Sequence, residues 1–178
     1  MLKLDAFNAV REAICIGYRS IDTSVVYGNL KEVGKAISSA IADGIVRRED
    51  LFISCKLWGT FYRPNLVEQG LDNTLNELGL DYCDLCNMHT PCSLEPGKKL
   101  YPEAENGLLA NDDVDPLDTW LSIEKLVQKK KCRSIGLANF NRTQTERILD
   151  NCTIKSSVAQ PRRFEEMVRI KRHHLHRL

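Results

Sequence analysis

Four side chains of this sequence could together reduce a carbonyl group. They are a carboxylate, a phenol, an ammonium and an imidazole, at Asp22, Tyr27, Lys56 and His89. An ammonium beside a phenol favours the phenolate, so Lys56 would make Tyr27 a proton donor nearer neutral pH. Asp22 would pair with Lys56 and keep it charged, and His89 could point an N–H at a carbonyl oxygen. The set suits a reaction in which hydride reaches carbon and Tyr27 gives a proton to oxygen.

Each of these residues also has an ordinary structural explanation. An Asp–Lys pair can be a plain salt bridge, and a histidine at the end of a strand is often a hydrogen-bonded structural residue. A tyrosine most often serves packing. Spacing alone leaves both explanations open.

The elements that must position these side chains alternate between helix and strand. Apolar periodicity predicts helices over residues 5–17, 29–44, 65–80, 116–131 and 142–151. Short apolar runs predict strands over residues 18–23, 50–57, 82–89, 133–139 and 155–160, and a long polar loop covers residues 90–115. This alternation is typical of an α/β fold with a parallel sheet and helices outside it.

A polar residue lies at the end of each of the five expected strands or one position before it: Asp22, Lys56, His89, Asn139 and Gln160. In parallel α/β folds the carboxyl ends of the strands converge on one face, where active sites lie. We therefore expect these side chains to be neighbours in space, with Tyr27 on the loop after the first strand.

Composition sets broad limits on function. The 178 residues are 43% hydrophobic with a formal net charge of +1, which fits an ordinary soluble globular protein. The charge gives no argument for a nucleic-acid partner, and we expect none. The sequence has no apolar run of the roughly 20 residues that a membrane helix needs, so we expect no membrane partner. The N-terminal segment lacks a signal-like apolar core, and we expect a cytoplasmic protein.

The seven cysteines show no disulfide framework, because their number is odd and their spacing irregular. This fits reduced thiols in a cytosolic protein. Cys83 and Cys86 form a CxxC motif, but we expect small buried residues there and no metal site.

Four stretches of the sequence resemble one known family. They are GYRSIDTSVVYGNLKEVGKAI, RREDLFISCKLW, LGLDYCDLCNMHTP and SIGLANFN, which occur in this order. They are similar to the aldo-keto reductases, most closely the aldose-reductase-like group, and the resemblance covers about residues 5–160.

This resemblance implies a fold, an activity and a set of site residues. The family folds as a (β/α)8 TIM barrel and uses NADPH to reduce aldehydes and ketones to alcohols. By position, the catalytic residues are Asp22, Tyr27, Lys56 and His89. The cofactor-binding residues are Asp22, Thr23, Asn139 and Gln160, and the substrate-binding residues are Val26, Trp58 and His89, with no metal site. The implied partner is a small-molecule carbonyl substrate.

The sequence departs from the family pattern at several positions. Ala138 stands where the family usually has a serine that bonds the nicotinamide carboxamide, and Thr90 stands where a tryptophan often follows the histidine. Ser20 and Leu30 replace a usual histidine and glutamate. None of these changes removes one of the four catalytic residues.

Length is the larger departure, since a TIM barrel typically takes about 250 residues. The resemblance implies a partial barrel truncated at both ends, with strands two to six of eight. We predict that residues 1–160 form this NADP-dependent oxidoreductase-like part. Residues 161–178 form a divergent basic tail whose apolar spacing would suit an amphipathic helix. The family holds the adenosine end of NADPH largely with later strands, so we expect a weaker grip on the cofactor.

An unclosed barrel would expose parallel strand edges near residues 18–24 and 155–160, and such edges invite pairing. We therefore expect either a partner chain that covers the edges or a poorly stable isolated chain. Three functions stay open on these grounds. The first is an NADPH-dependent aldehyde or ketone reductase, and the second is a catalytically inactive, truncated relative that acts, if at all, through partner binding. The third is an aldo-keto-type regulatory subunit of a membrane complex.

Overall fold

The computed structural model describes residues 3–160. The predicted tail helix over residues 161–178 lies outside the described part. The helices are α1 (Lys3–Cys15), α2 (Leu30–Ala42), α3 (Val67–Leu78), α4 (Pro116–Gln128) and α5 (Arg142–Asn151). The strands are β1 (Ser20–Asp22), β2 (Phe52–Leu57), β3 (Cys83–Met88), β4 (Cys132–Ala138) and β5 (Val158–Gln160). Short 3-10 helices occur at η1 (Val25–Tyr27), η2 (Arg48–Asp50) and η3 (Gly59–Phe61).

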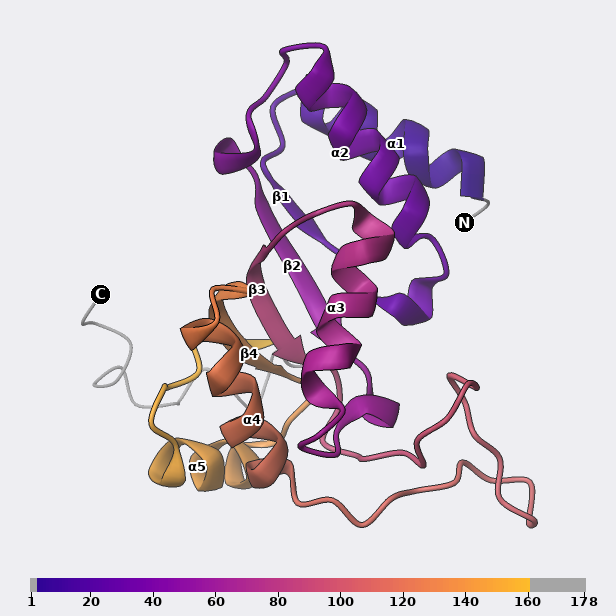
Figure 1. Ribbon diagram of the computed structural model, residues 1–178, viewed down its shortest axis with the longest axis vertical. Helices are drawn as coiled ribbons and strands as arrows, with labels where there is room; N and C mark the ends of the chain where they lie inside the picture. The colour runs from indigo at the N-terminus through magenta and orange to yellow at the C-terminus, as the bar shows by residue number, and fades with distance from the viewer. Residues whose placement is uncertain (1–2, 161–178) are drawn as a thin grey trace.

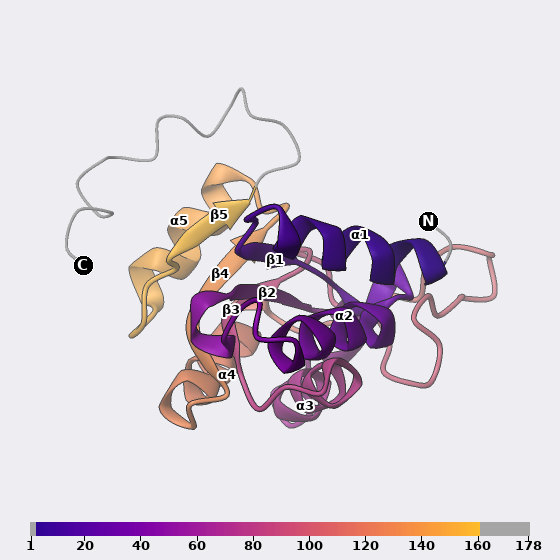
Figure 2. The ribbon, with the colours of Figure 1, turned by 90° about the horizontal axis from the view of Figure 1, so that it is seen from above.

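The five strands form one parallel sheet in the order β1-β2-β3-β4-β5. Each strand pairs with the next one along the chain, and a helix lies in each connection. Figures 1 and 2 show that the sheet curls and that helices lie around its outer side. The described residues thus form a partial TIM barrel, which confirms the predicted α/β fold class.

The apolar core lies between the sheet and the surrounding helices. Ile53, Cys55 and Leu57 of β2 are fully or almost fully buried, as are Ile123 and Leu126 of α4. Burial of such side chains stabilises the fold by about 1.5–3 kcal/mol for each large one. The core therefore holds the strand ends in fixed relative positions.

Two helices begin at residues that satisfy their free backbone N–H groups. The Asp115 carboxylate accepts from the Leu117 amide, and Pro116 follows at the first position of α4. At α5, Asn141 and Gln144 bond each other's backbone amides in a capping box. These local signals explain why the predicted helix starts agree with the structure.

The two outer strands are shorter than the sequence predicts. Tyr18 and Arg19 were expected to begin β1, but the Tyr18 amide bonds the Ala13 carbonyl at 2.8 Å and so completes the end of α1. At the other edge, the Ser156 hydroxyl bonds the Val158 carbonyl at 2.7 Å, and the strand that pairs with β4 begins at Val158. The ladder nevertheless reaches one residue beyond each short strand, because the Phe52 amide donates to the Arg19 carbonyl and the Ser157 amide donates to the Ile135 carbonyl.

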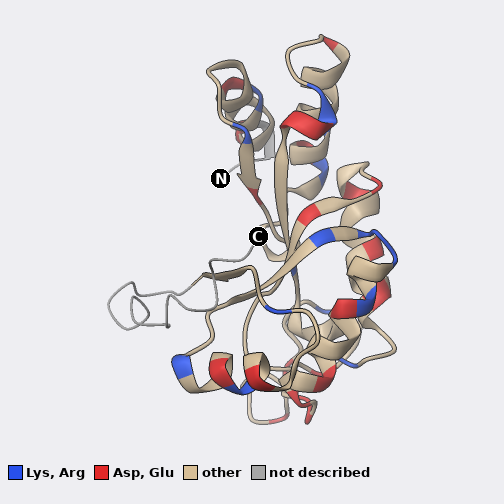
Figure 3. Ribbon diagram, turned by 90° about the vertical axis from the view of Figure 1, so that its left-hand side faces the viewer, with Lys and Arg blue, Asp and Glu red and all other residues tan. Residues whose placement is uncertain are grey.

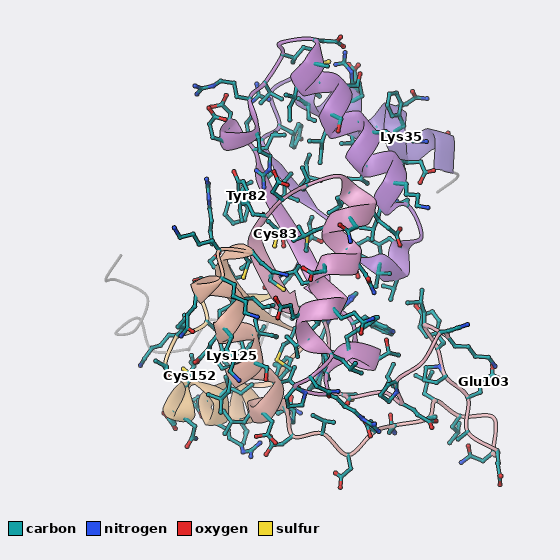
Figure 4. All side chains as sticks on the ribbon, in the orientation of Figure 1. Lys35, Tyr82, Cys83, Glu103, Lys125 and Cys152 are labelled. Atoms are coloured by element: carbon teal, nitrogen blue, oxygen red, sulfur yellow. The ribbon has the colours of Figure 1, made fainter. Side chains whose placement is uncertain are left out.

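The segment between β3 and α4 is a long loop that projects from the carboxyl ends of the strands (Figure 1). Short antiparallel bridges join Leu94 to Asn111 and Glu103 to Leu109. Figure 4 labels Glu103 on the projecting part of this loop and Cys83 at the sheet. An ion pair between Arg63 and Asp112 at 2.7 Å ties the loop to the residues before α3.

Charged residues are interspersed over the helices and loops (Figure 3). No helix between residues 3 and 160 has the length and apolar character needed to cross a membrane. Within the same range, no group of three or more His, Cys, Asp or Glu side chains is arranged to hold a metal ion. The seven cysteines are free thiols, with Cys83 and Cys86 fully buried.

Candidate active site

The carboxyl ends of the five strands bring the predicted polar residues to one end of the sheet. Asp22 and Gln160 are the last residues of β1 and β5, whereas Lys56 lies one residue before the end of β2. His89 and Asn139 directly follow β3 and β4. The predicted strand ends are therefore correct to within one residue.

Lys56 links the first two of these strands. Its side chain is only 3% exposed, and its ammonium donates both to the Asp22 carboxylate and to the Tyr27 hydroxyl, the latter at 3.2 Å. Tyr27 is the last residue of η1. From this position both its hydroxyl and its ring lie close to the Lys56 ammonium. The carboxylate offsets the cost of burying the ammonium, so the cation can stay beside the phenol.

His89 lies in contact with this group. Its ring packs edge-on against Tyr27 and Trp58, with centroid separations of 6.2 and 5.2 Å. Burial and the nearby Lys56 ammonium lower the pKa of His89 from 6.5 to about 4. The imidazole is therefore neutral at physiological pH. Its Nδ1 lies 3.0 Å from the Ser24 hydroxyl oxygen.

A cavity of about 600 Å³ opens over these groups. It is lined by Val26, Tyr27, Lys56, Trp58, His89, Thr90, Tyr101, Asn139 and Gln160. A larger groove of about 770 Å³ runs between α3 and the loop at residues 96–100, but it shares only Trp58 with the cavity. The cavity combines an ionic pair, a phenol and a neutral imidazole with aromatic walls, which is the environment expected of an active site.

The side of the cavity at β4 and β5 carries two amides. The Asn139 side-chain amide donates to the His89 carbonyl at 2.7 Å, and the Asn139 backbone amide donates to the Gln160 carbonyl at 2.9 Å. Asn139 has a left-handed backbone with φ of 63°. Asparagine tolerates this conformation better than most residues. This turn and its two bonds hold the Asn139 amide at the cavity wall.

The structure places two predicted residues differently from the rest. Asp22 and Thr23 do not line the cavity: Asp22 is linked to it by its ion pair with Lys56, and Thr23 is buried. The Thr23 hydroxyl has no hydrogen-bond partner among the described residues.

Sequence reasoning missed two residues of the site. Ser24 lies two positions after Asp22 and meets His89 across 65 positions of sequence. Tyr101 comes from the long loop and packs edge-on against Trp58 with centroids 5.6 Å apart. The polar Ser24 next to two predicted site residues was a usable signal, whereas nothing local marks Tyr101.

Comparison with known proteins decides the family. The model of the Aldo/keto reductase family matches residues 2–167. The chain belongs to the aldo/keto reductase family. Members of this family are oxidoreductases, and they generally use NADP(H).

Several aldo/keto reductases are similar to this chain in sequence. Rat aldo-keto reductase family 1 member C18 is 46% identical over 154 residues, which cover 86% of this chain and 48% of that protein. Human aldo-keto reductase family 1 member C3 is 47% identical over 150 residues, covering 84% and 46%. Mouse estradiol 17 beta-dehydrogenase 5 is 47% identical over 153 residues, covering 86% and 47%. The chain spans about half the length of the curated relatives it matches.

A solved aldose reductase from Schistosoma japonicum has the same fold over the shared part. The two structures superpose with a TM-score of 0.85 at 42% identity, covering 89% of this chain and 52% of the other. The half-barrel is therefore a recognisable part of an aldo/keto reductase.

Proposed function

We propose that this aldo/keto reductase reduces aldehydes or ketones to alcohols with NADPH. The observation that carries the proposal is the buried Lys56 ammonium, which contacts both the Asp22 carboxylate and the Tyr27 hydroxyl. A phenol held against a buried cation can release its proton during reaction, because the cation stabilises the phenolate.

Tyr27 serves as the general acid in this proposal. As the carbonyl carbon accepts a hydride, negative charge develops on the carbonyl oxygen, and the Tyr27 hydroxyl transfers its proton to that oxygen. The product is an alcohol, and the phenolate left on Tyr27 is stabilised by Lys56 until water returns a proton. Asp22 keeps Lys56 charged and in place throughout.

His89 orients the carbonyl. Because its ring is neutral, one nitrogen carries a hydrogen and can donate to the carbonyl oxygen without adding a second cation beside Lys56. Its ring packs against Tyr27 and Trp58 and lines the cavity. The oxygen would then lie within reach of both Tyr27 and His89.

The residues on the β4–β5 side fit the nicotinamide end of the cofactor. Asn139 and Gln160 line the cavity and present amide groups that suit a carboxamide. When bound, NADPH supplies the hydride. Ala138, the last residue of β4, offers no side-chain hydrogen bond to the carboxamide.

The substrate would occupy the rest of the cavity. Val26 and Trp58 form an apolar wall, and Tyr101 extends it from the long loop. These contacts suit the apolar part of a small aldehyde or ketone, while Tyr27 and His89 bind its oxygen.

A fluorescence titration of the 178-residue chain with NADPH, followed by an aldehyde-reduction assay, tests the proposal. We expect weak but saturable binding and measurable oxidation of NADPH by a simple aldehyde. Binding that stays undetectable up to about 1 mM NADPH, the upper end of ordinary KM values, would contradict the proposal for this chain.

A further inference from the structure

Ser24 is the N-cap residue of η1, but its side chain makes no capping hydrogen bond. Its backbone is extended, and its hydroxyl makes no hydrogen bond to the η1 amides; the Tyr27 amide bonds the Ser24 carbonyl instead. Serine is a favoured capping residue because its hydroxyl usually satisfies such amides. Here the hydroxyl is free for another partner.

That partner is His89. The Ser24 side chain is fully buried, and its Oγ lies 3.0 Å from His89 Nδ1, the one hydrogen-bond partner of this hydroxyl among the described residues. The ring also faces the charged groups of Lys56 from β2 and Asp22 from β1, and the Tyr27 phenol from η1. Ser24 is thus the neutral polar group that contacts Nδ1, and unlike His89 it does not line the cavity.

Either Ser24 or His89 could donate this hydrogen bond. The direction can be inferred from the buried hydrogen that each possibility would leave without an acceptor. If Ser24 accepted a hydrogen from Nδ1, its own hydroxyl hydrogen would be buried without an acceptor, which is unfavourable. If Ser24 donates to Nδ1, the hydroxyl is satisfied and the single ring hydrogen of the neutral imidazole must sit on Nε2. The second arrangement leaves no buried donor unpaired.

We propose that Ser24 is a positioning residue that donates a hydrogen bond to His89 Nδ1 and so holds the hydrogen on Nε2, where it can bond the carbonyl oxygen of the substrate. The catalytic consequence rests on the proposed reductase function. The assignment of the ring hydrogen to Nε2 does not rest on that function, because the tautomer can be measured without cofactor or substrate.

Nitrogen-15 NMR of the 178-residue chain tests the tautomer directly. The His89 resonances are those that disappear in His89→Gln, which separates them from the other three histidines. We expect Nδ1 without hydrogen and Nε2 with hydrogen near neutral pH. A hydrogen found on Nδ1 overturns the proposal.

Substitution of Ser24 tests the hydrogen bond. In Ser24→Ala the Nδ1 resonance should move toward that of a nitrogen without a donor partner. Ser122→Ala removes another buried hydroxyl, one that bonds the Asp118 carbonyl in α4, and should leave the His89 resonances in place. An Nδ1 resonance unchanged by Ser24→Ala overturns the proposal.

Turnover supplies the functional measurement. We expect Ser24→Ala to lower kcat for aldehyde reduction about tenfold, the size of one ordinary hydrogen bond, with NADPH binding unchanged. Full kcat in Ser24→Ala refutes the positioning role. Absence of turnover in the unmodified chain instead refutes the proposed function. The NMR measurement still tests the tautomer in that case.

Discussion

At the scale of single residues, the site depends on a lysine in an unusual place. Lysine is almost never fully buried unless it is paired, yet Lys56 is 3% exposed. The Asp22 carboxylate provides the pairing, and the Tyr27 hydroxyl takes another of its hydrogens. The pair is therefore not a plain surface salt bridge, and its contact with the Tyr27 hydroxyl is the reason that we propose a catalytic role for it.

His89 leads to a prediction about stability and pH. Its pKa in the folded chain is lowered from 6.5 to about 4, so the unfolded chain takes up a proton at a pH where the folded chain does not. Stability should therefore fall as pH falls from about 6.5 to 4, by at most about 1.4 kcal/mol per pH unit. Solvent screening reduces this figure, because the ring is only half-buried.

Urea unfolding at several pH values measures this effect. His89→Gln cannot take up the proton, so the wild-type chain should lose more stability than the variant between about pH 6.5 and 4. Equal losses in the two proteins would show that His89 does not titrate as its surroundings indicate.

At the scale of elements, helices α2 and α3 approach each other closely at one glycine. A Cβ atom on Gly34 would lie 2.3 Å from the Leu78 carbonyl oxygen, a backbone atom that cannot easily move. In Gly34→Ala, overpacking should lower the free energy of unfolding by about 1–3 kcal/mol. The better helix propensity of alanine offsets only about 1 kcal/mol of this loss, so we expect a net destabilisation.

Gly97→Ala is the matched control, because a Cβ there meets nothing within 4 Å. It should change the free energy of unfolding by no more than about 0.5 kcal/mol in the same urea titration. If Gly34→Ala is as stable as the wild type, the two helices are not packed as closely as described.

The elements also show what the sequence could and could not predict. Helix α4 was predictable because Pro116 and Asp115 mark its start and its apolar residues recur at helical spacing. The two outer strands were predicted too long. The Tyr18 amide bonds back to α1, and whether a residue of an outer strand pairs with its neighbour depends on tertiary contacts that the local sequence does not show. Tyr101 was missed because the course of a long loop depends on tertiary contacts such as that with Trp58.

At the scale of the whole molecule, the sheet is open within residues 3–160. Strands β1 and β5 are the two ends of the strand order, and each pairs with a single neighbour. Phe52 and Val158, both on strands, are 43% and 38% exposed. Such edges and apolar strand positions favour pairing with further strands. We propose that a partner chain covers them, which is also the basis of the alternative, non-catalytic function.

Gel filtration with circular dichroism tests this proposal on the 178-residue chain. We expect self-association or a broad, poorly cooperative unfolding transition when the chain is alone. A sharp monomer peak with cooperative unfolding would refute the need for a partner.

The most direct test of the central claim is aldehyde reduction by Tyr27→Phe. The substitution removes one oxygen atom and keeps the ring that packs against His89. We predict that turnover falls by about 100-fold or more, the usual contribution of a general acid, while NADPH binding stays at the wild-type level. Tyr18→Phe, which changes an exposed tyrosine outside the cavity, should retain full turnover. Turnover that survives Tyr27→Phe would contradict the assignment of Tyr27 as the acid and, with it, the mechanism built on Lys56.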